Sequence, residues 1–176
     1  VLRAVLDRSG VSAADVQHVV MGQVIQTEPR DMYLSRVASV QAGVGHGTPA
    51  MNVNRLCGSG LQAIVSAAQG ILVGDAKVAL AGGAESMSRA PFVMPKAETA
   101  FSRTNKVEDT TIGWRFVNKK MKAMYGTDSM PETAENLADE FHISRADQDA
   151  FAIRSQERYA AAHAAGFFEN ELLTVP

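Results

Sequence analysis

Hydrophobic and polar positions alternate between helical and strand-like periods along the first ninety residues. Apolar residues recur three or four apart, as on one face of a helix, over residues 2–9, 33–41 and 58–72. Short apolar runs typical of buried strands lie between them, at residues 19–25, 50–54 and 77–81. Strand-sized and helix-sized segments thus follow one another in turn. That order predicts a layered α/β domain.

The pattern changes after residue 90. From there to residue 130 the chain is rich in polar residues, and its one helical candidate covers residues 110–124. Further helices are expected at residues 131–141 and 144–166, since Pro131 suits the first position of a helix and Gly166 the position just past its end. The sequence therefore predicts a mainly helical second part.

A single cysteine stands where an expected strand meets an expected helix. Cys57 follows the strand at residues 50–54, and the helix begins near Gly58. Unpaired N–H groups and the helix dipole concentrate positive potential there, which favours thiolate over thiol and can stabilise an oxyanion. Gly58 and Gly60 also let a substrate carbonyl approach the sulfur closely. The alternative is an inert buried thiol, the usual state of a free cysteine.

The proposed nucleophile requires a general base. A helix terminus contributes only about 0.3–1 kcal/mol, up to ~2 kcal/mol in buried geometry, which is too little for efficient attack by itself. None of the four histidines has a recognisable catalytic spacing relative to Cys57; they are His18, His46, His142 and His163. We therefore expect the base to lie outside these 176 residues.

Composition narrows the classes of partner. With 46% hydrophobic residues, the 176-residue chain can bury a sizeable core. Charged residues make up 20%, the net charge is −2, and like charges do not cluster, so neither nucleic acid nor an anionic membrane is an expected partner. No stretch reaches the roughly 20 apolar residues of a membrane helix. We expect a soluble protein that binds small molecules or other protein chains.

The lone cysteine also excludes an intrachain disulfide and a multi-thiolate metal site within this chain, and no metal is expected. The chain starts at Val1, inside an apolar helical pattern. We therefore expect that residues preceding it are missing, and that a targeting segment could have been lost with them.

Residues 54–63, Asn-Arg-Leu-Cys-Gly-Ser-Gly-Leu-Gln-Ala, resemble the nucleophile segment of thiolases, the acyl-CoA acyltransferases that make or cleave 3-oxoacyl-CoA. Three further segments resemble the same family in the same order, at residues 81–88, 133–136 and 144–152. The resemblance spans essentially the whole chain. Within the family, residues 24–34 resemble bacterial β-ketothiolases, whereas residues 88–94 and 108–116 resemble 3-oxoadipyl-CoA thiolases.

The resemblance implies a fold of two similar α/β halves with a loop domain inserted in the first. By this comparison, residues 1–90 are the N-terminal α/β domain without its first strand, and residues 91–176 begin the loop domain. The expected fold is therefore an incomplete layered α/β/α half with an inserted, mainly helical loop domain. The family's Gly-His-Pro segment, with the activating histidine, and its Cys-x-Gly-Gly-Gly segment, with a second cysteine, are not among these residues.

The resemblance also implies roles for particular residues. Cys57 would hold the acyl group as a thioester, and Met130 would line the pocket for the acyl chain and pantetheine. Ser129 stands where many members have a histidine near coenzyme A (CoA). The implied partners are acyl-CoA and CoA, which is a substrate or product, and no cofactor is expected. A homodimer or homotetramer, a bacterial-type cytoplasmic location and a place in fatty acid metabolism are the remaining expectations.

Two other features bear on phosphate binding. The pair Gly82-Gly83 lacks the spacing and the lysine of a phosphate loop, so a strand-ending turn is the simpler interpretation. A solvated helix face explains a set of basic residues better than contact with CoA phosphates; they are Arg115, Lys119, Lys120 and Lys122.

Two alternatives to a thiolase remain open at this point. A decarboxylating condensing enzyme of the ketoacyl synthase type shares the general architecture and a cysteine nucleophile. A non-catalytic binding or assembly module with the same fold would explain why a base is lacking.

Overall fold

The computed structural model describes residues 1–175 and contains two compact units, Val1–Thr111 and a second that begins at Ile112. The boundary expected at residue 90 lies inside the first unit. The assignment of residues 1–90 and 91–176 to two family domains stays a prediction.

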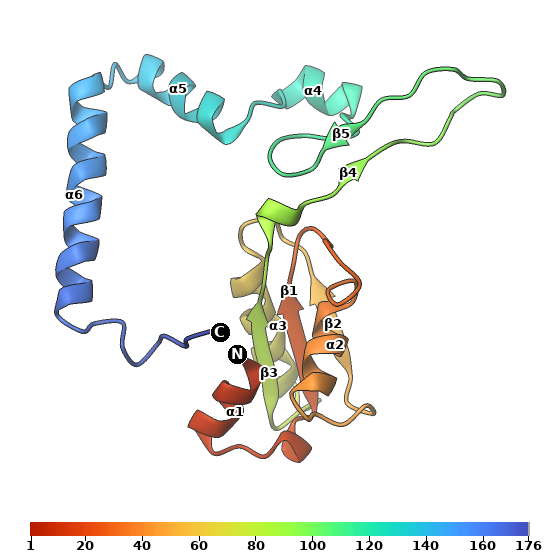
Figure 1. Ribbon diagram of the computed structural model, residues 1–176, viewed down its shortest axis with the longest axis vertical. Helices are drawn as coiled ribbons and strands as arrows, with labels where there is room; N and C mark the ends of the chain where they lie inside the picture. The colour runs from red at the N-terminus through yellow and green to blue at the C-terminus, as the bar shows by residue number, and fades with distance from the viewer. Residues whose placement is uncertain (176) are drawn as a thin grey trace. The chain divides into compact units, whose positions relative to one another are not determined.

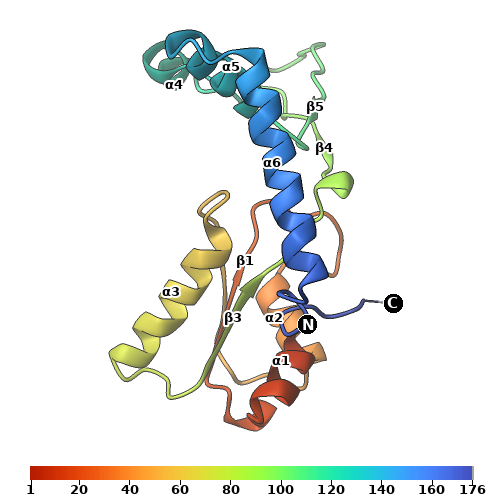
Figure 2. The ribbon, with the colours of Figure 1, turned by 90° about the vertical axis from the view of Figure 1, so that its left-hand side faces the viewer.

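A three-stranded parallel sheet organises the first unit (Figure 1). Its strands are β1 (His18–Gly22), β2 (Ala50–Val53) and β3 (Ala79–Gly83), in the order β2-β1-β3. Helix α3 (Ser59–Leu72) covers one face, and α1 (Leu2–Ser9) with α2 (Leu34–Gln41) covers the other (Figure 2). The expected α/β architecture is confirmed.

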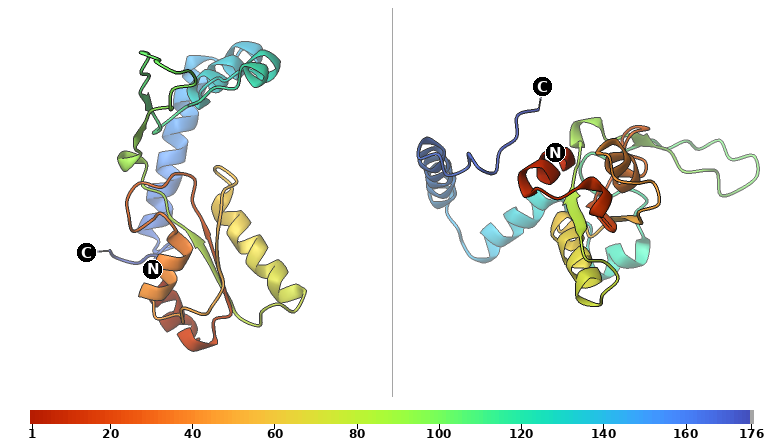
Figure 3. Two further views of the ribbon diagram at one scale, coloured as in Figure 1. Left: turned by 90° about the vertical axis from the view of Figure 1, so that its right-hand side faces the viewer. Right: turned by 90° about the horizontal axis from the view of Figure 1, so that it is seen from below.

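Side chains alternate between the two faces of β1, as the period of a strand requires. Val19 and Met21 join a cluster that includes Leu2 and Leu6 of α1. Val20, on the opposite face, packs with two residues of α3 that are at most 5% exposed; they are Ala63 and Ala67. Small alanine side chains let α3 pack closely against this face of the sheet. Figure 3 shows the fold in two further views.

The end of β1 touches the start of α3 so closely that position 22 requires glycine. A Cβ atom on Gly22 would lie 2.5 Å from the carbonyl carbon of Ser59 and 2.8 Å from the backbone nitrogen of Gly60. On the other side, a Cβ on Gly83 would lie 2.9 Å from the carbonyl oxygen of Gly22. These backbone contacts position the N-terminus of α3 against the sheet.

The first unit also contains short elements outside the sheet. A 3₁₀ turn, η1 (Ala13–Asp15), precedes β1, and another, η2 (Met87–Arg89), follows β3. Strands β4 (Phe92–Val93) and β5 (Glu108–Asp109) form an antiparallel pair.

The second unit consists of helices whose ends are marked by local signals. Helices α4 (Lys119–Tyr125), α5 (Met130–Glu140) and α6 (Arg145–Ala164) begin after Asn118, Ser129 and Ser144, whose side chains accept hydrogen bonds from first-turn N–H groups. The helices expected at residues 131–141 and 144–166 are confirmed. In the part of the chain that the structure describes, no helix combines the length and apolarity needed to span a membrane.

The single helix expected over residues 110–124 is wrong. Only its last turns form, as α4, because the preceding segment adopts turns incompatible with a helix. The Asp109 carboxylate accepts hydrogen bonds from the N–H and hydroxyl of Thr111, and Gly113 and Phe116 have φ angles of 91° and 52°.

Two strand limits also differ from the prediction. β1 ends at Gly22 rather than near residue 25, and β3 covers Ala79–Gly83 rather than residues 77–81. Beyond Gly22, the N–H of Gln23 still donates to the carbonyl oxygen of Val53 in β2, but the N–H groups of Val24 and Ile25 donate to the side chain of Glu85.

Candidate active site

Three segments lie at the carboxyl edge of the parallel sheet, each following one strand. Residues 23–31 follow β1, residues 54–58 follow β2, and residues 84–90 follow β3. Binding sites of open α/β sheets form at this edge, outside the carboxyl ends of the strands. Cys57 belongs to the second segment, directly before α3.

The backbone before Cys57 makes a tight, strained turn. Leu56 has a φ angle of 50°, in the left-handed region that a leucine adopts at a cost of about 1–2 kcal/mol. The N–H of Leu56 donates to Asn54 Oδ1 at 3.0 Å, and the N–H of Gly58 donates to the carbonyl oxygen of Arg55 at 3.1 Å. Strain of this kind persists only where several contacts hold it.

The side chain of Ser59 closes the turn from inside. Its hydroxyl donates to the carbonyl oxygen of Leu56 at 2.6 Å and accepts from the N–H of Arg55 at 2.9 Å. The N–H of Ser59 also donates to Leu56, at 3.0 Å. Because Ser59 is only 5% exposed, water competes little for these bonds.

Cys57 is exposed, so the burial assumed in the alternative of an inert thiol is wrong. Cys57 directly precedes Gly58, the N-cap of α3, and among the described residues no side chain caps this helix end. The N-terminus of a helix carries partial positive charge and favours anionic groups near it. The arrangement can therefore stabilise a thiolate, and a negative oxygen formed beside it.

The carboxylate of Glu85, in the segment after β3, binds the backbone of the segment after β1. Glu85 Oε2 accepts a hydrogen bond from the N–H of Val24 at 2.8 Å, and Oε1 accepts from the N–H of Ile25 at 3.1 Å. These two N–H groups are therefore not available to extend β1. Asn54 Nδ2 lies 3.5 Å from the carbonyl oxygen of Val24, which links the first segment to the second.

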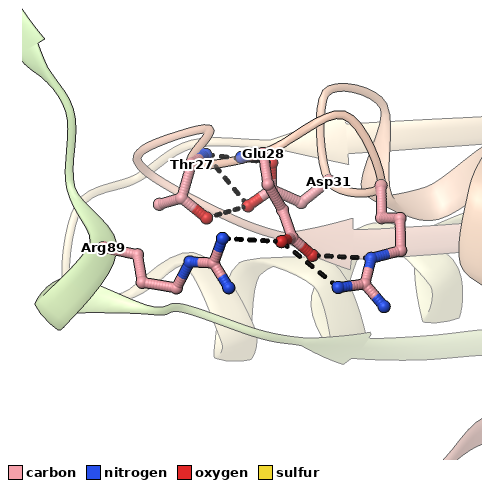
Figure 4. Close-up of polar contacts among 5 residues, drawn as sticks. Thr27, Glu28, Asp31 and Arg89 are labelled. Atoms are coloured by element: carbon pink, nitrogen blue, oxygen red, sulfur yellow. Dashed lines mark hydrogen bonds and ion pairs between the residues drawn. The ribbon is translucent and has the colours of Figure 1, made fainter.

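The loop after β1 folds around a second carboxylate, that of Asp31 (Figure 4). It accepts hydrogen bonds from the Thr27 hydroxyl at 2.6 Å and from the N–H groups of Thr27 and Glu28, both at 2.9 Å. Partial burial acts to raise the pKa of Asp31, but the hydrogen bonds from Thr27, Glu28 and Gln23 outweigh it and lower the pKa. The loop is thus most stable with Asp31 ionised.

An ion pair gives a further link between the first and third segments. Arg89 lies 3.1 Å from Glu28 Oε2, and Arg30 lies 2.8 Å from Glu28 Oε1 (Figure 4). Neither this ion pair nor the hydrogen bonds of Asp31 and Glu85 were predicted from the sequence pattern. The turn around Asp31 could have been predicted from the polar loop that places Thr27 four residues before it. No local sequence pattern relates Glu85 to Val24.

The other predicted site residues belong to the second unit. Ser129 is the N-cap of α5: its hydroxyl accepts from the N–H of Glu132 at 3.4 Å, and its own N–H donates to Glu132 Oε2 at 2.6 Å. The bonds from the backbone and side chain of Ser129 lower the pKa of Glu132. Met130 is the first residue of α5, with 74% of its surface exposed. A role of either residue in binding CoA stays a prediction.

No histidine among the described residues is hydrogen-bonded to Cys57. His18 begins β1, at the opposite end of the sheet, and His46 lies in the turn before β2. His142 and His163 belong to the second unit. Within the described residues, no group of three or more histidine, cysteine, aspartate or glutamate side chains is placed to hold a metal ion.

Comparisons with known proteins agree with this geometry. A family model described as "Thiolase, N-terminal domain" matches residues 1–176. The chain is 54% identical over 160 residues to a β-ketoadipyl-CoA thiolase of Pseudomonas putida, covering 91% of this chain and 40% of that protein. It is 51% identical to the β-ketothiolase BktB of Cupriavidus necator, covering 99% of this chain and 43% of that protein.

The structure is similar to solved thiolases as well. Against human mitochondrial 3-ketoacyl-CoA thiolase in complex with CoA, the TM-score is 0.81 at 39% identity, covering 96% of this chain and 42% of the human one. Against the Bacillus anthracis acetyl-CoA acetyltransferase, the TM-score is 0.80 at 30% identity, with 98% and 42% covered. The chain spans less than half the length of the relatives it matches. It belongs to the thiolase family and matches that family's N-terminal domain.

Proposed function

We propose that the protein containing this chain is a thiolase-type acyl-CoA acyltransferase, which forms or cleaves 3-oxoacyl-CoA through a thioester on Cys57. The observation that carries the proposal is the exposed thiol of Cys57, held at the start of α3 by a strained turn. Membership of the thiolase family supports it. The matched relatives are thiolases, so neither the ketoacyl synthase nor the assembly module is favoured.

The reaction has two covalent steps. In the first, the thiolate of Cys57 attacks the carbonyl carbon of an acyl-CoA, the new sulfur–carbon bond forms, and the bond to CoA breaks, releasing CoA as a thiol after it takes up a proton. In the second, a second acyl-CoA loses a proton from its α-carbon, and this carbon attacks the acyl group and displaces the Cys57 thiolate. Cleavage is the reverse sequence.

The N-terminus of α3 contributes to both steps in the same way. Negative charge develops first on sulfur and then on the former carbonyl oxygen, and positive potential at the helix start stabilises each. Proton transfer requires a base and an acid that the resemblance assigns to a histidine and a second cysteine in segments outside these residues. This chain thus contributes the nucleophile and its support.

Substrate contacts and assembly are part of the same proposal. Met130 and Ser129 would contact the pantetheine and CoA portions of the substrate, with no metal or other cofactor. Residues 1–90 would form the N-terminal domain and residues 91–176 the start of the loop domain. Names of relatives that include β-ketoadipyl-CoA support a CoA thioester substrate. We also propose a homodimer or homotetramer, a cytoplasmic location and a role in fatty acid metabolism.

Acylation of Cys57 tests the proposal directly. The protein is expressed from its complete coding sequence, mixed with acetyl-CoA, quenched and digested, and the peptide containing Cys57 is analysed by mass spectrometry. We expect an acetyl adduct on Cys57, and a loss of thiolase activity of at least about 10³-fold in Cys57→Ser. Absence of the adduct, together with full activity in Cys57→Ser, would contradict the assignment.

A further inference from the structure

We propose that Glu85 is a positioning residue for Cys57, acting through the loop after β1 and through Asn54; this rests on the proposed role of Cys57 as nucleophile. Glu85 lies 28 positions after Cys57 in the sequence, and its carboxylate accepts hydrogen bonds from Val24 and Ile25. Its influence passes through three post-strand segments that meet at the carboxyl edge of the sheet.

The first step is the hydrogen bonding of Glu85 to the loop after β1. Both oxygens of its carboxylate are used, one on each of two consecutive N–H groups, those of Val24 and Ile25. Hydrogen bonds to an ionised acceptor are about twice as strong as neutral ones. The carboxylate offers one oxygen to each of these two N–H groups, whereas a neutral amide at this position would offer both of them a single oxygen.

The second step carries this constraint to the turn before Cys57. Once its N–H is held by Glu85, Val24 directs its carbonyl oxygen to Asn54 Nδ2, 3.5 Å away. The same Asn54 amide uses its oxygen to accept the N–H of Leu56 at 3.0 Å. A carboxamide held at its nitrogen has its oxygen placed as well, since the group is planar.

The third step is the strain at Leu56. Its left-handed conformation, with φ of 50°, sets the direction in which the chain leaves toward Cys57. Ser59 holds this residue from the helix side, and Asn54 holds it from the strand side. When the strand-side support weakens, Leu56 can relax toward a right-handed or extended conformation, which turns the Cys57 side chain away from its position at the helix start.

Other contacts hold the residues on either side of Glu85 in place. The N–H of Ala84 donates to the carbonyl oxygen of Gly22 at 3.2 Å, and Arg89 pairs with Glu28 at 3.1 Å. The segment that carries Glu85 is therefore attached to the end of β1 before Glu85 and to the loop after β1 beyond it. This attachment limits the freedom of the carboxylate, so its two hydrogen bonds are retained although the side chain is exposed.

Four variants test the proposal in the protein expressed from its complete coding sequence. Glu85→Gln keeps the size of the side chain and removes the second acceptor; Asn54→Ala removes the link; the third variant combines both changes. Glu98→Gln removes an equal charge elsewhere in the first unit and is the matched control. The rate constant of Cys57 acylation and the KM for acetyl-CoA are measured by rapid quench and mass spectrometry, and Tm verifies folding.

We expect Glu85→Gln to slow acylation about 10-fold with KM unchanged, since small displacements of a reacting group reduce rate rather than binding. The combined variant should be no slower than Asn54→Ala alone, because both changes break one path. Glu98→Gln should match the unchanged protein. Acylation at the normal rate in Glu85→Gln, or independent effects that multiply in the combined variant, would overturn the proposal.

A second readout separates this proposal from the proposed function. If the unchanged protein forms no acyl adduct, the acyltransferase assignment fails, and alkylation of Cys57 by iodoacetamide then decides about positioning. The proposal is supported if Glu85→Gln slows alkylation and the combined variant is no slower than Asn54→Ala alone. It is overturned if Glu85→Gln and the unchanged protein are alkylated at equal rates. If Glu85→Gln fails to fold, Glu85→Asp is used in its place. Its side chain is one methylene shorter, so the carboxylate no longer reaches the two N–H groups, and the same results are expected.

Discussion

Replacing Gly22 by alanine tests how the sheet positions the nucleophile. The new methyl group would lie 2.5 Å from the carbonyl carbon of Ser59, 2.6 Å from its oxygen and 2.8 Å from the nitrogen of Gly60. All three are backbone atoms, so no side chain can rotate away to make room. Either the end of β1 or the start of α3 must move.

The size of the movement follows from these distances. Ordinary contact begins near 3.4 Å, so the backbone of Ser59 must retreat by about 0.9 Å from a Cβ atom that would lie at 2.5 Å. Such overpacking destabilises a folded protein by about 1–3 kcal/mol. Because Ser59 holds the turn that contains Cys57, a shift approaching 1 Å should also slow acylation by about 10²-fold.

The assay compares Gly22→Ala with Gly70→Ala, a second glycine-to-alanine change, located within α3. A Cβ atom at Gly70 has no atom within 4 Å, and alanine favours a helix over glycine by about 1 kcal/mol, so Gly70→Ala should stabilise the protein slightly. Urea unfolding and the acylation rate of Cys57 are measured for both. If Gly22→Ala retains both stability and acylation rate, the close contact between β1 and α3 does not position the nucleophile.

Two further predictions concern one polar side chain in each unit, the carboxylate of Asp31 and the hydroxyl of Ser129. Asp31→Asn should lower stability at pH 7 by about 1 kcal/mol, because the hydrogen bonds from Thr27 and Glu28 favour the charged form in a partly solvated loop. The folded pKa of Asp31 is lowered, so this contribution is present above the ordinary value of 3.8 and is lost as pH falls through the folded pKa. Urea midpoints of Asp31→Asn and the unchanged protein should therefore converge as the pH falls below 3.8 through the folded pKa, and a constant gap would contradict the role of the charge. Ser129→Ala should lower Tm through loss of the α5 cap, worth about 1 kcal/mol. If the KM for acetyl-CoA stays unchanged, Ser129 caps the helix without binding CoA, whereas a raised KM supports the proposed contact.

Much of the fold follows from local sequence signals. The strand and helix periods predicted the α/β layers, and the signals at Pro131, Ser144 and Gly166 located α5 and α6 within a few residues. The short spacing between the strand ending near residue 54 and the helix beginning near Gly58 also placed Cys57 at the start of α3. Each of these features depends on residues close together in the chain.

Local patterns were misleading where a turn or distant residue determines the backbone. Residues 110–118 carry helix-compatible apolar spacing, but the Asp109 turn and the positive φ angles of Gly113 and Phe116 prevent a helix. β1 does not extend to residue 25, because Glu85 accepts hydrogen bonds from the N–H groups of Val24 and Ile25. Periodicity contains no information about such a partner.

The sequence by itself thus determined the order of the elements, the thiolase family and the position of the cysteine between strand and helix. Tertiary structure alone decided that Cys57 is exposed, that β1 lies between β2 and β3, and that Glu85 and Asn54 stand on the strand side of the turn before Cys57. The physical reason is separation along the chain. Glu85 and Val24 are 61 residues apart and meet only because the strands before them pair side by side in one sheet.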